Sequence, residues 1–395
     1  MSRTAEYDVI IAGGGPAGAT AGYMLGTAGL TVLIIDKSVF PREKLCGGLI
    51  THKTVRLLER VFGESALSLK NKGIIIHESD GYEVRTRSSA IVRGKGASPF
   101  FFLDRSGYDH YLLEKARMAG ADVIAGDGIR YLDVLKSEVT TVSGRRFSAG
   151  FIIGADGVNS RIRRSFATDL FGRHDWSGSL AAAFEIFPER NAVKKQLDHP
   201  VLYYGFVDWG YGWVFPVGDR LRVGMCALKK KNRKKVITAF RDFLSVMDIK
   251  GAHEEKMRGY VLPYGCFLPS PVFRNVLLVG DAAGFADPLL GEGIFYAQRS
   301  AELASQAILG AKQENMGISQ RATDDIQKLT AAHYMRSLQK DIMPELVYAG
   351  KIQDTIFSCL KRFDYLPLRI LMNMFGDMPI EAVHGIRSYR WMRKK

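Results

Sequence analysis

The stretch that most constrains the fold lies at residues 7–36. Four apolar residues at 9–12 predict a buried strand, and they lead directly into Gly13, Gly15 and Gly18 with the spacing G-x-G-x-x-G. A helix of small residues follows, and a second apolar strand ends at Asp36. In such a unit the glycines permit a tight turn, backbone approach to a pyrophosphate and close helix–strand packing, and the acid binds ribose hydroxyls. The sequence therefore predicts a dinucleotide site.

Composition and cysteine spacing set the broad class. The 395 residues predict two or three domains, and a hydrophobic content of 47% is enough for a large core. No apolar run approaches the length of a membrane span, and the first residues lead straight into a strand, so we expect a cytoplasmic protein without a signal peptide. The cysteines (Cys46, Cys226, Cys266, Cys359) are widely spaced and predict reduced thiols, and neither they nor the eight histidines show a metal-ligand spacing.

The net charge of +14 indicates either an anionic binding partner or a solvated positive surface. Basic residues cluster at 161–164, 229–235 and 390–395. No nucleic-acid module accompanies them, so we expect no nucleic-acid partner. An anionic membrane surface fits better, because each basic residue near it adds about 1 kcal/mol. We therefore expect peripheral association with the inner face of the membrane, and a solvated positive face is the alternative.

A glycine-rich loop follows the dinucleotide unit at residues 41–48, Pro-Arg-Glu-Lys-Leu-Cys-Gly-Gly. Gly47 and Gly48 allow backbone to approach a flat ligand closely. Cys46 would then lie beside that ligand, and neighbouring Arg42 and Lys44 favour its thiolate. A plain connection with an inert cysteine is the alternative.

The central part of the chain alternates in the manner of strands. Residues 73–102 predict strands of a second sheet. Arg105 precedes a helix predicted over 108–119, where it would reach a phosphate or ring carbonyl or form a surface salt bridge. Strands are also predicted at 120–125, 131–135 and 147–153, and the last leads into Gly154-Ala-Asp-Gly157, a second contact with the cofactor through Asp156.

Residues 176–264 are rich in aromatic and β-branched residues and predict further strands. Within them, Tyr211, Trp213 and Phe215 alternate, so on a strand they share one face. Such a row is either the wall of a large apolar pocket or ordinary core.

A last buried strand at 275–279 leads into Gly280-Asp281 and a glycine-rich helix start. The backbone amides of Gly291–Ile294 would face an anionic ligand at the beginning of a helix that runs to about residue 310. Residues 319–395 read as helical, with one apolar stripe that predicts a core-facing helix, a lid over a lipid pocket or an interfacial helix. The stripe consists of Leu368, Leu371, Met372 and Phe375.

These motifs together resemble the flavoproteins of the para-hydroxybenzoate hydroxylase fold. Two of them, Pro41-x-x-Lys-x-Cys-Gly-Gly48 and Tyr211-x-Trp-x-Phe-Pro216, look like the two signatures of the geranylgeranyl reductase family. The resemblance implies an α/β fold with a Rossmann-like FAD-binding domain on a mostly parallel sheet, a β-sheet substrate domain and a helical C-terminal region. The expected ranges are 1–72, 103–168 and 270–318 for FAD, 73–102 and 169–269 for substrate, and 319–395 for the helical region.

The resemblance also implies roles for single residues. Tyr211, Trp213 and Phe215 would line a prenyl pocket, and Cys46 or Tyr211 would supply a proton. The family usually has a Gly-x-Gly pair after the second signature, whereas here Gly224 is followed by Met225 and Cys226. FAD would be held by Gly13, Gly15, Ala17, Gly18, Asp36, Cys46, Gly47, Arg105, Ile129, Asp156, Asp281, Gly291, Gly293 and Ile294.

The implied activity is saturation of isolated prenyl double bonds by hydride from N5 of reduced FAD. The substrate would be a prenylated lipid, quinone or chlorophyll precursor, and the external reductant NAD(P)H or a ferredoxin-type electron-donor protein. The alternatives on the same fold are a monooxygenase or halogenase, which would activate oxygen at the flavin, and a quinone-linked electron-transfer flavoprotein.

Overall fold

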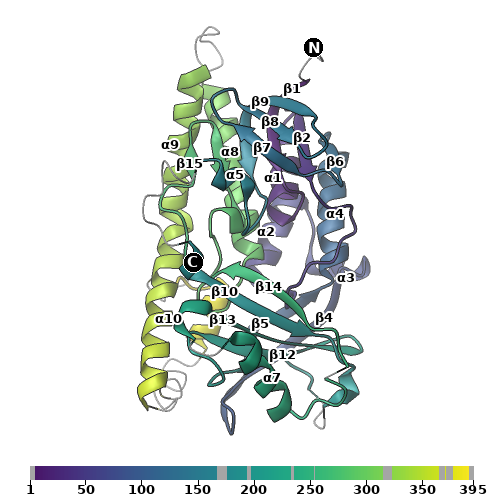
Figure 1. The fold of residues 1–395 in the computed structure, drawn as a ribbon, viewed down its shortest axis with the longest axis vertical. Coiled ribbons are helices and arrows are strands. Elements are labelled where there is room, and N and C mark those ends of the chain that lie inside the picture. The colour runs from purple at the N-terminus through teal and green to yellow at the C-terminus, as the bar shows by residue number, and fades with distance from the viewer. Residues whose placement is uncertain are drawn as a thin grey trace.

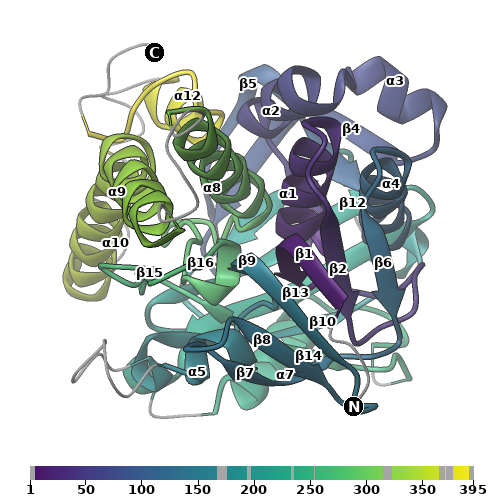
Figure 2. The same ribbon diagram turned by 90° about the horizontal axis from the view of Figure 1, so that it is seen from above.

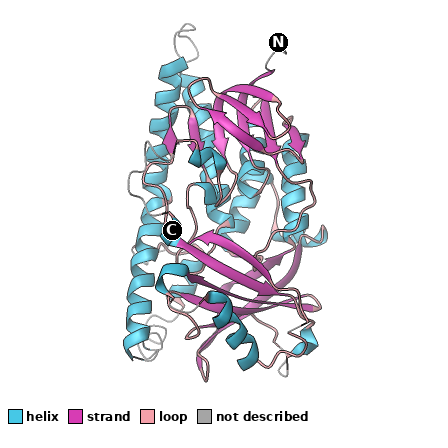
Figure 3. Ribbon diagram, in the orientation of Figure 1, coloured by secondary structure: helices cyan, strands magenta, loops and turns pink. Residues whose placement is uncertain are grey.

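The computed structural model describes residues 5–166, 176–193, 197–232, 235–252, 254–314, 323–363, 370 and 377–390. Strands gather into two sheets at opposite ends of the molecule (Figure 3), and the long helices α9 and α10 run along its side past both (Figure 1). This mixed architecture with a helical C-terminal region confirms the predicted fold class.

The first sheet is built around the predicted dinucleotide unit. Strand β1 lies between β2 and β9 and is parallel to both, and its apolar residues 9–12 are buried. Parallel strands buried on both faces read as continuous apolar runs, as 9–12 and 32–35 do. The central order is β15-β16-β9-β1-β2-β6, with β7 and β8 joined through β9. The strands are β1 (Ala5–Ala12), β2 (Val32–Asp36), β6 (Asp122–Ala125), β7 (Ile129–Asp133), β8 (Glu138–Thr141), β9 (Arg146–Gly154), β15 (Val272–Phe273) and β16 (Val276–Leu278).

Helices cover one side of this sheet. Helix α1 packs beside α4 and α8, whereas β7 and β8 lie on the other side (Figure 2). Helix α9 packs on α8, and α10 follows it. The helices are α1 (Pro16–Thr27), α2 (His52–Phe62), α3 (Ala66–Asn71), α4 (Arg105–Met118), α5 (Arg161–Arg164), α7 (Val236–Val246), α8 (Ile294–Glu314), α9 (Thr323–Asp341), α10 (Met343–Phe363) and α12 (Met378–Val383).

The second sheet is mainly antiparallel, in the order β14-β10-β13-β12-β11-β4-β5-β3. Most of its strands come from the ranges predicted for the substrate domain, but β3 follows the 41–48 loop and pairs with β5. The boundaries of the domains stay a prediction. The strands are β3 (Leu49–Ile50), β4 (Ile75–Arg85), β5 (Ala90–Leu103), β10 (Leu180–Ile186), β11 (Val201–Tyr203), β12 (Gly210–Val217), β13 (Arg220–Leu228) and β14 (Arg258–Pro263).

Helix α7 departs from the strands predicted for this part of the chain. Its buried residues recur at helical spacing, and they pack with β13 residues in one apolar cluster. The period of 3.6 residues is visible in the sequence, but the surrounding aromatic and β-branched residues favoured a strand interpretation. Those helix residues are Val236, Ala239, Phe240, Phe243 and Leu244.

The predicted apolar stripe of the C-terminal region, Leu368, Leu371, Met372 and Phe375, lies outside the described residues. The described C-terminal residues do form helices α9, α10 and α12.

Candidate active site

A cavity of about 1030 Å³ lies between the two sheets and is lined by residues from both. It therefore brings together motifs that are more than two hundred residues apart in the sequence. Of the residues predicted to bind cofactor or substrate, all but Gly18 line it: Gly13, Gly15, Ala17, Asp36, Cys46, Gly47, Arg105, Ile129, Asp156, Tyr211, Trp213, Phe215, Asp281, Gly291, Gly293 and Ile294.

Gly18 does not line the cavity, and its lack of a side chain permits close packing of α1 on β1. A Cβ atom added to Gly18 would lie 1.8 Å from the carbonyl oxygen of Gly13. Helix α1 therefore approaches the end of β1 closely enough to point its first turn into the cavity, where its free N–H groups favour a phosphate. Gly13 and Gly15 line the cavity, and direct contact of the three glycines with a cofactor stays a prediction.

Asp36 ends β2 at the cavity wall. Its carboxylate accepts hydrogen bonds from the backbone N–H of Gly14, at 2.7 Å, and of Ser38, at 2.8 Å. These bonds fix the acid beside the glycine turn, at the position from which a carboxylate reaches ribose hydroxyls.

Arg105 forms a buried ion pair rather than the surface salt bridge considered from the sequence. Its guanidinium donates to both carboxylate oxygens of Asp109, at 2.9 to 3.1 Å. Arg42 contacts the same carboxylate at 3.1 Å. One buried carboxylate therefore holds two guanidinium groups in place, and both arginines line the cavity.

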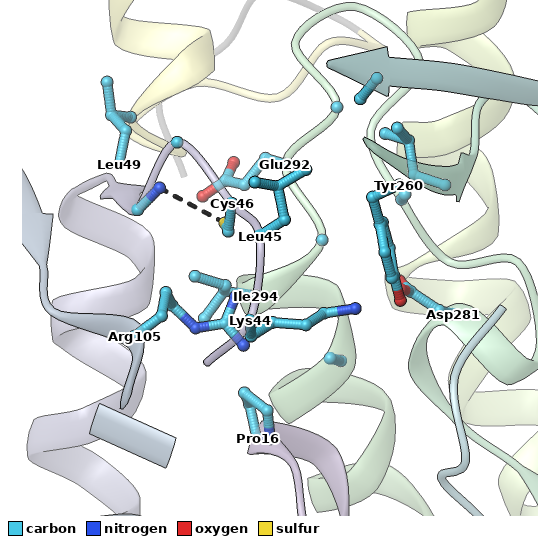
Figure 4. A pocket seen from close by; sticks show the side chains of 18 of the residues that line it. Pro16, Lys44, Leu45, Cys46, Leu49, Arg105, Tyr260, Asp281, Glu292 and Ile294 are labelled. Carbon is cyan, nitrogen blue, oxygen red and sulfur yellow. Dashed lines mark hydrogen bonds between the residues drawn. The ribbon is translucent and has the colours of Figure 1, made fainter. Parts of the chain in front are cut away.

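Lys44 extends across the cavity toward Asp281 and Tyr260 (Figure 4). Its ammonium lies 3.3 Å from the centre of the Tyr260 ring. Burial lowers the pKa of Lys44 to about 8, against the attraction of Asp281, and burial likewise raises the pKa of Asp281. Lys44 and Asp281 neutralise each other only in part, so both can still interact with a charged ligand in the cavity.

The Cys46–Gly48 loop passes between the sheets. Gly48 N–H donates to Cys46 Sγ at 3.3 Å, and Arg222 of β13 donates to the carbonyl oxygens of Gly47, at 3.0 Å, and of Leu103, at 2.8 Å. Gly48 has a φ of +69°, and a Cβ there would lie 1.8 Å from the Arg222 guanidinium. Glycine is thus required both for the turn and for the arginine that holds the loop.

The residues before α8 form a polar turn that also lines the cavity, with Glu292 close to Cys46 (Figure 4). Glu292 lies between two of the predicted cofactor glycines and pairs with Lys53 at 2.6 Å, and it accepts a hydrogen bond from Thr51 at 2.9 Å. The Tyr211 hydroxyl donates to the carbonyl oxygen of Leu290. These contacts fix the Gly291–Ile294 backbone at the start of α8, as a site for a planar ring requires.

Tyr211, Trp213 and Phe215 of β12 form one wall, which supports the pocket interpretation over ordinary core. Their ring centroids are 5.9 Å and 6.2 Å apart, and all three line the cavity. The Trp213 indole crosses over Gly224 and donates from Nε1 to Glu185 at 3.1 Å. Cys226 pairs with Tyr211 across the strands and also lines the cavity, where the family usually has glycine.

Residues of the C-terminal helices also line the cavity. Ile352 and Ile356 come from α10, Ile380 and Val383 come from α12, and Tyr389 follows. These residues were not predicted from the sequence, and neither were Glu185, Tyr260 and Arg222. No motif marks them, because they reach the cavity only through tertiary packing.

The cavity fits FAD on several observations. A glycine-lined helix start, the acid at the end of β2 and the paired guanidinium groups of Arg42 and Arg105 all line it. Asp156 also lines it, with one buried carboxylate oxygen unpartnered among the described residues. The family model described as an FAD binding domain matches residues 6–306. The fold and site therefore define an FAD-dependent oxidoreductase.

Two further comparisons narrow the class. A geranylgeranyl diphosphate reductase of Rhodobacter capsulatus is 30% identical over 327 residues, 77% of this chain and 75% of that protein. A geranylgeranyl bacteriochlorophyll reductase-like structure from Thermoplasma acidophilum, 19% identical, superposes with a TM-score of 0.76 over 99% of this chain and 94% of that one. The chain belongs to the geranylgeranyl reductase family of flavoproteins.

A relative whose name indicates a different chemistry also matches most of the chain. A 1H-pyrrole-2-carbonyl-[peptidyl-carrier protein] chlorinase of Pseudomonas fluorescens is 24% identical over 418 aligned residues, covering 94% of this chain and 90% of that protein.

The basic runs differ in their surroundings. Arg161 and Arg164 line the cavity, and Arg163 is buried and donates to the Ala282 and Val158 carbonyl oxygens. Residues 229–231 are exposed, and 391–395 lie outside the described residues. None of the helices in the described residues is both long and apolar enough to span a membrane.

Proposed function

We propose that the protein saturates isolated double bonds of a prenyl chain carried by a lipid, quinone or chlorophyll precursor. The observation that carries this proposal is the continuity of the cavity. The same space is lined by the glycine-rich helix start, by a wall of three aromatic rings and by apolar residues of the C-terminal helices. A long hydrocarbon chain and a flavin ring would therefore meet in it.

An isolated alkene carries no carbonyl group to stabilise charge, so positioning and exclusion of water must contribute strongly. Tyr211, Trp213 and Phe215 are each less than 10% exposed and supply a dry, shaped surface. When bound and reduced, the flavin supplies hydride at its N5 atom. The chain's own part is to hold the double bond against the Cys46–Gly48 loop.

The two proton donors expected from the sequence both line the cavity. Tyr211 directs its hydroxyl at the Leu290 carbonyl, and burial raises its pKa well above the usual range, which makes its proton hard to release. Cys46 lies on the loop between the sheets and remains the better of these two candidates.

The proposal also requires an electron donor for the flavin and access to a lipid substrate. NAD(P)H or a ferredoxin-type protein would reduce the flavin, and the exposed lysines 229–231 would assist contact with an anionic membrane. Cosedimentation with phosphatidylserine-containing liposomes at low salt tests the membrane contact. A protein that stays in the supernatant would exclude it.

A second candidate is oxygen chemistry at the flavin, as in a monooxygenase or halogenase. The chlorinase relative supports it, because its match covers nearly the whole chain. Electron transfer to a quinone head group is a further alternative on this fold. Each would use the cofactor half of the cavity without requiring alkene reduction.

The deciding experiment uses the purified protein, anaerobic dithionite and mass spectrometry of prenyl lipids. Geranylgeranyl diphosphate and lipids that co-purify with the protein would be incubated with reduced enzyme, with unreduced enzyme as control. A gain of about two mass units per double bond supports the proposal. Unchanged lipids together with rapid oxygen consumption would favour the second candidate, and absence of bound FAD would contradict both.

A further inference from the structure

We propose that Glu185 of β10 donates the proton that completes saturation of the double bond. This inference rests on the proposed function, since it assigns the second half of the same reaction. Glu185 lies outside both family signatures, and its side chain is fully buried while lining the cavity.

The strand register explains how Glu185 comes to lie beside the aromatic wall of the cavity. Glu185, Gly224 and Trp213 are cross-strand neighbours on β10, β13 and β12. A Cβ at Gly224 would lie 2.2 Å from Cζ2 of Trp213, so only glycine lets the indole cross β13 and donate to Oε1 of Glu185. Glu185, Gly224 and Trp213 thus form one cross-strand row, in which the Glu185 carboxyl group faces the cavity.

Glu185 also lies near the Cys46–Gly48 loop. A side chain at Gly47 would come within 3.8 Å of Trp213 Nε1, the atom that binds Glu185 at 3.1 Å. The carboxyl group is therefore bound to the middle ring of the aromatic wall, which also lies close to the Gly47 backbone predicted to adjoin the flavin.

The carboxyl group is poised as an acid. Its Oε2 atom has no hydrogen-bond partner among the described residues, and no lysine or arginine there forms an ion pair with it. Burial raises the pKa of Glu185 to about 7, although Arg222 of β13, Trp213 of β12 and Arg258 of β14 favour the carboxylate. A buried carboxylic acid that is half-protonated near neutral pH suits proton donation.

The step is balanced with the hydride that the proposed function already invokes. One alkene carbon receives hydride with its electron pair, and the other receives the Glu185 proton as the O–H bond breaks. The alkene is reduced, reduced flavin is oxidised, and Glu185 is left as a carboxylate. The Trp213 N–H stabilises that carboxylate until solvent returns a proton.

Glu185→Gln tests the proposal, because the amide keeps the shape and an acceptor for Trp213. Exposed Glu59→Gln is the matched control. Both variants should bind FAD like wild type. In anaerobic single turnovers with geranylgeranyl diphosphate, or a co-purifying lipid that wild type saturates, Glu185→Gln should be at least about 100-fold slower. Wild-type rates should fall above about pH 7, and the variant should lose that limb.

A second readout needs no turnover. The indole ¹⁵N–H signal of Trp213, assigned with Trp213→Phe, should shift with a midpoint near pH 7 in wild type and stay constant in Glu185→Gln. A rate within threefold of wild type with an unchanged pH profile would overturn the role of Glu185, as would a wild-type indole signal that is flat from pH 5 to 9. Wild-type enzyme that saturates no prenyl chain would instead overturn the proposed function, and this proposal with it.

Discussion

The two halves of the cavity are built on different physical principles. The cofactor half is made mostly of backbone, with glycines, helix starts and a few paired charges, whereas the substrate half is made of large side chains. A backbone surface is fixed by local chain geometry. An aromatic surface depends on which strands lie next to each other and in what register.

The two halves should therefore respond differently to substitutions. Where backbone forms the site, any added side chain meets atoms that cannot move aside. Where side chains form the site, a change redirects a ring and leaves the fold in place. Variants in the two halves should therefore affect cofactor binding and prenyl reduction separately.

The largest effect is expected from Gly18→Ala in the cofactor half. The new Cβ would overlap the Gly13 carbonyl oxygen, so α1 must move away from β1. We expect FAD affinity to fall at least 100-fold and the free energy of unfolding to fall by about 3 kcal/mol. Isothermal titration with FAD and urea unfolding measure both.

Gly310→Ala on α8 is the control for Gly18→Ala, since its Cβ would meet no atom closer than 3.7 Å. It should be neutral or stabilise the helix by about 0.5 kcal/mol. If Gly18→Ala bound FAD as tightly as this control, the close helix–strand contact would not be needed for the cofactor.

An effect of similar size concerns the buried carboxyl group of the substrate half. The pKa of Glu185 rises from an ordinary 4.5 to about 7, so the native state binds its proton more tightly than the unfolded chain does. Unfolding of the apoprotein should therefore become easier as pH rises through that interval, by about 3 kcal/mol from this group. The difference in urea stability between wild type and Glu185→Gln, measured from pH 4.5 to 8, isolates it. A difference that does not change with pH would contradict the shift.

The smallest effect is expected from Gly224→Ala, which tests most directly whether the two halves of the cavity can be altered separately. Gly224→Ala would push the Trp213 indole out of its place over β13. Prenyl turnover should fall about 10- to 100-fold because the chain is misplaced, while FAD affinity stays within twofold. Met225→Leu, on the opposite face of the same strand, should leave both unchanged. Equal losses of FAD binding and turnover in Gly224→Ala would show that the two halves are not separable.

The sequence revealed the cofactor half in detail because its signals are local. Gly13, Gly15 and Asp36 lie within one βαβ unit, and the spacing alone predicts their use. The aromatic row of β12 was also visible, since alternation places Tyr211, Trp213 and Phe215 on one face.

The rest of the site was not predictable from local pattern. Glu185 comes after three alanines and Phe184 in β10, with no motif around it. Its position in the site depends on β13, which brings Gly224 between Glu185 and Trp213. Ile352 and Tyr389 are ordinary apolar residues in sequence, and they reach the cavity only through the packing of the C-terminal helices. Register and long-range packing have no short sequence signature.

The chain's route through the two sheets limits how such a protein can be altered. Among the described strands the chain passes from one sheet to the other four times, between β2 and β3, β5 and β6, β9 and β10, and β14 and β15. No single cut separates a cofactor module from a substrate module. Exchange of the substrate sheet as a cassette would need matched junctions at all four crossings, so new specificity is reached more readily by point substitutions within cross-strand rows such as Glu185–Gly224–Trp213.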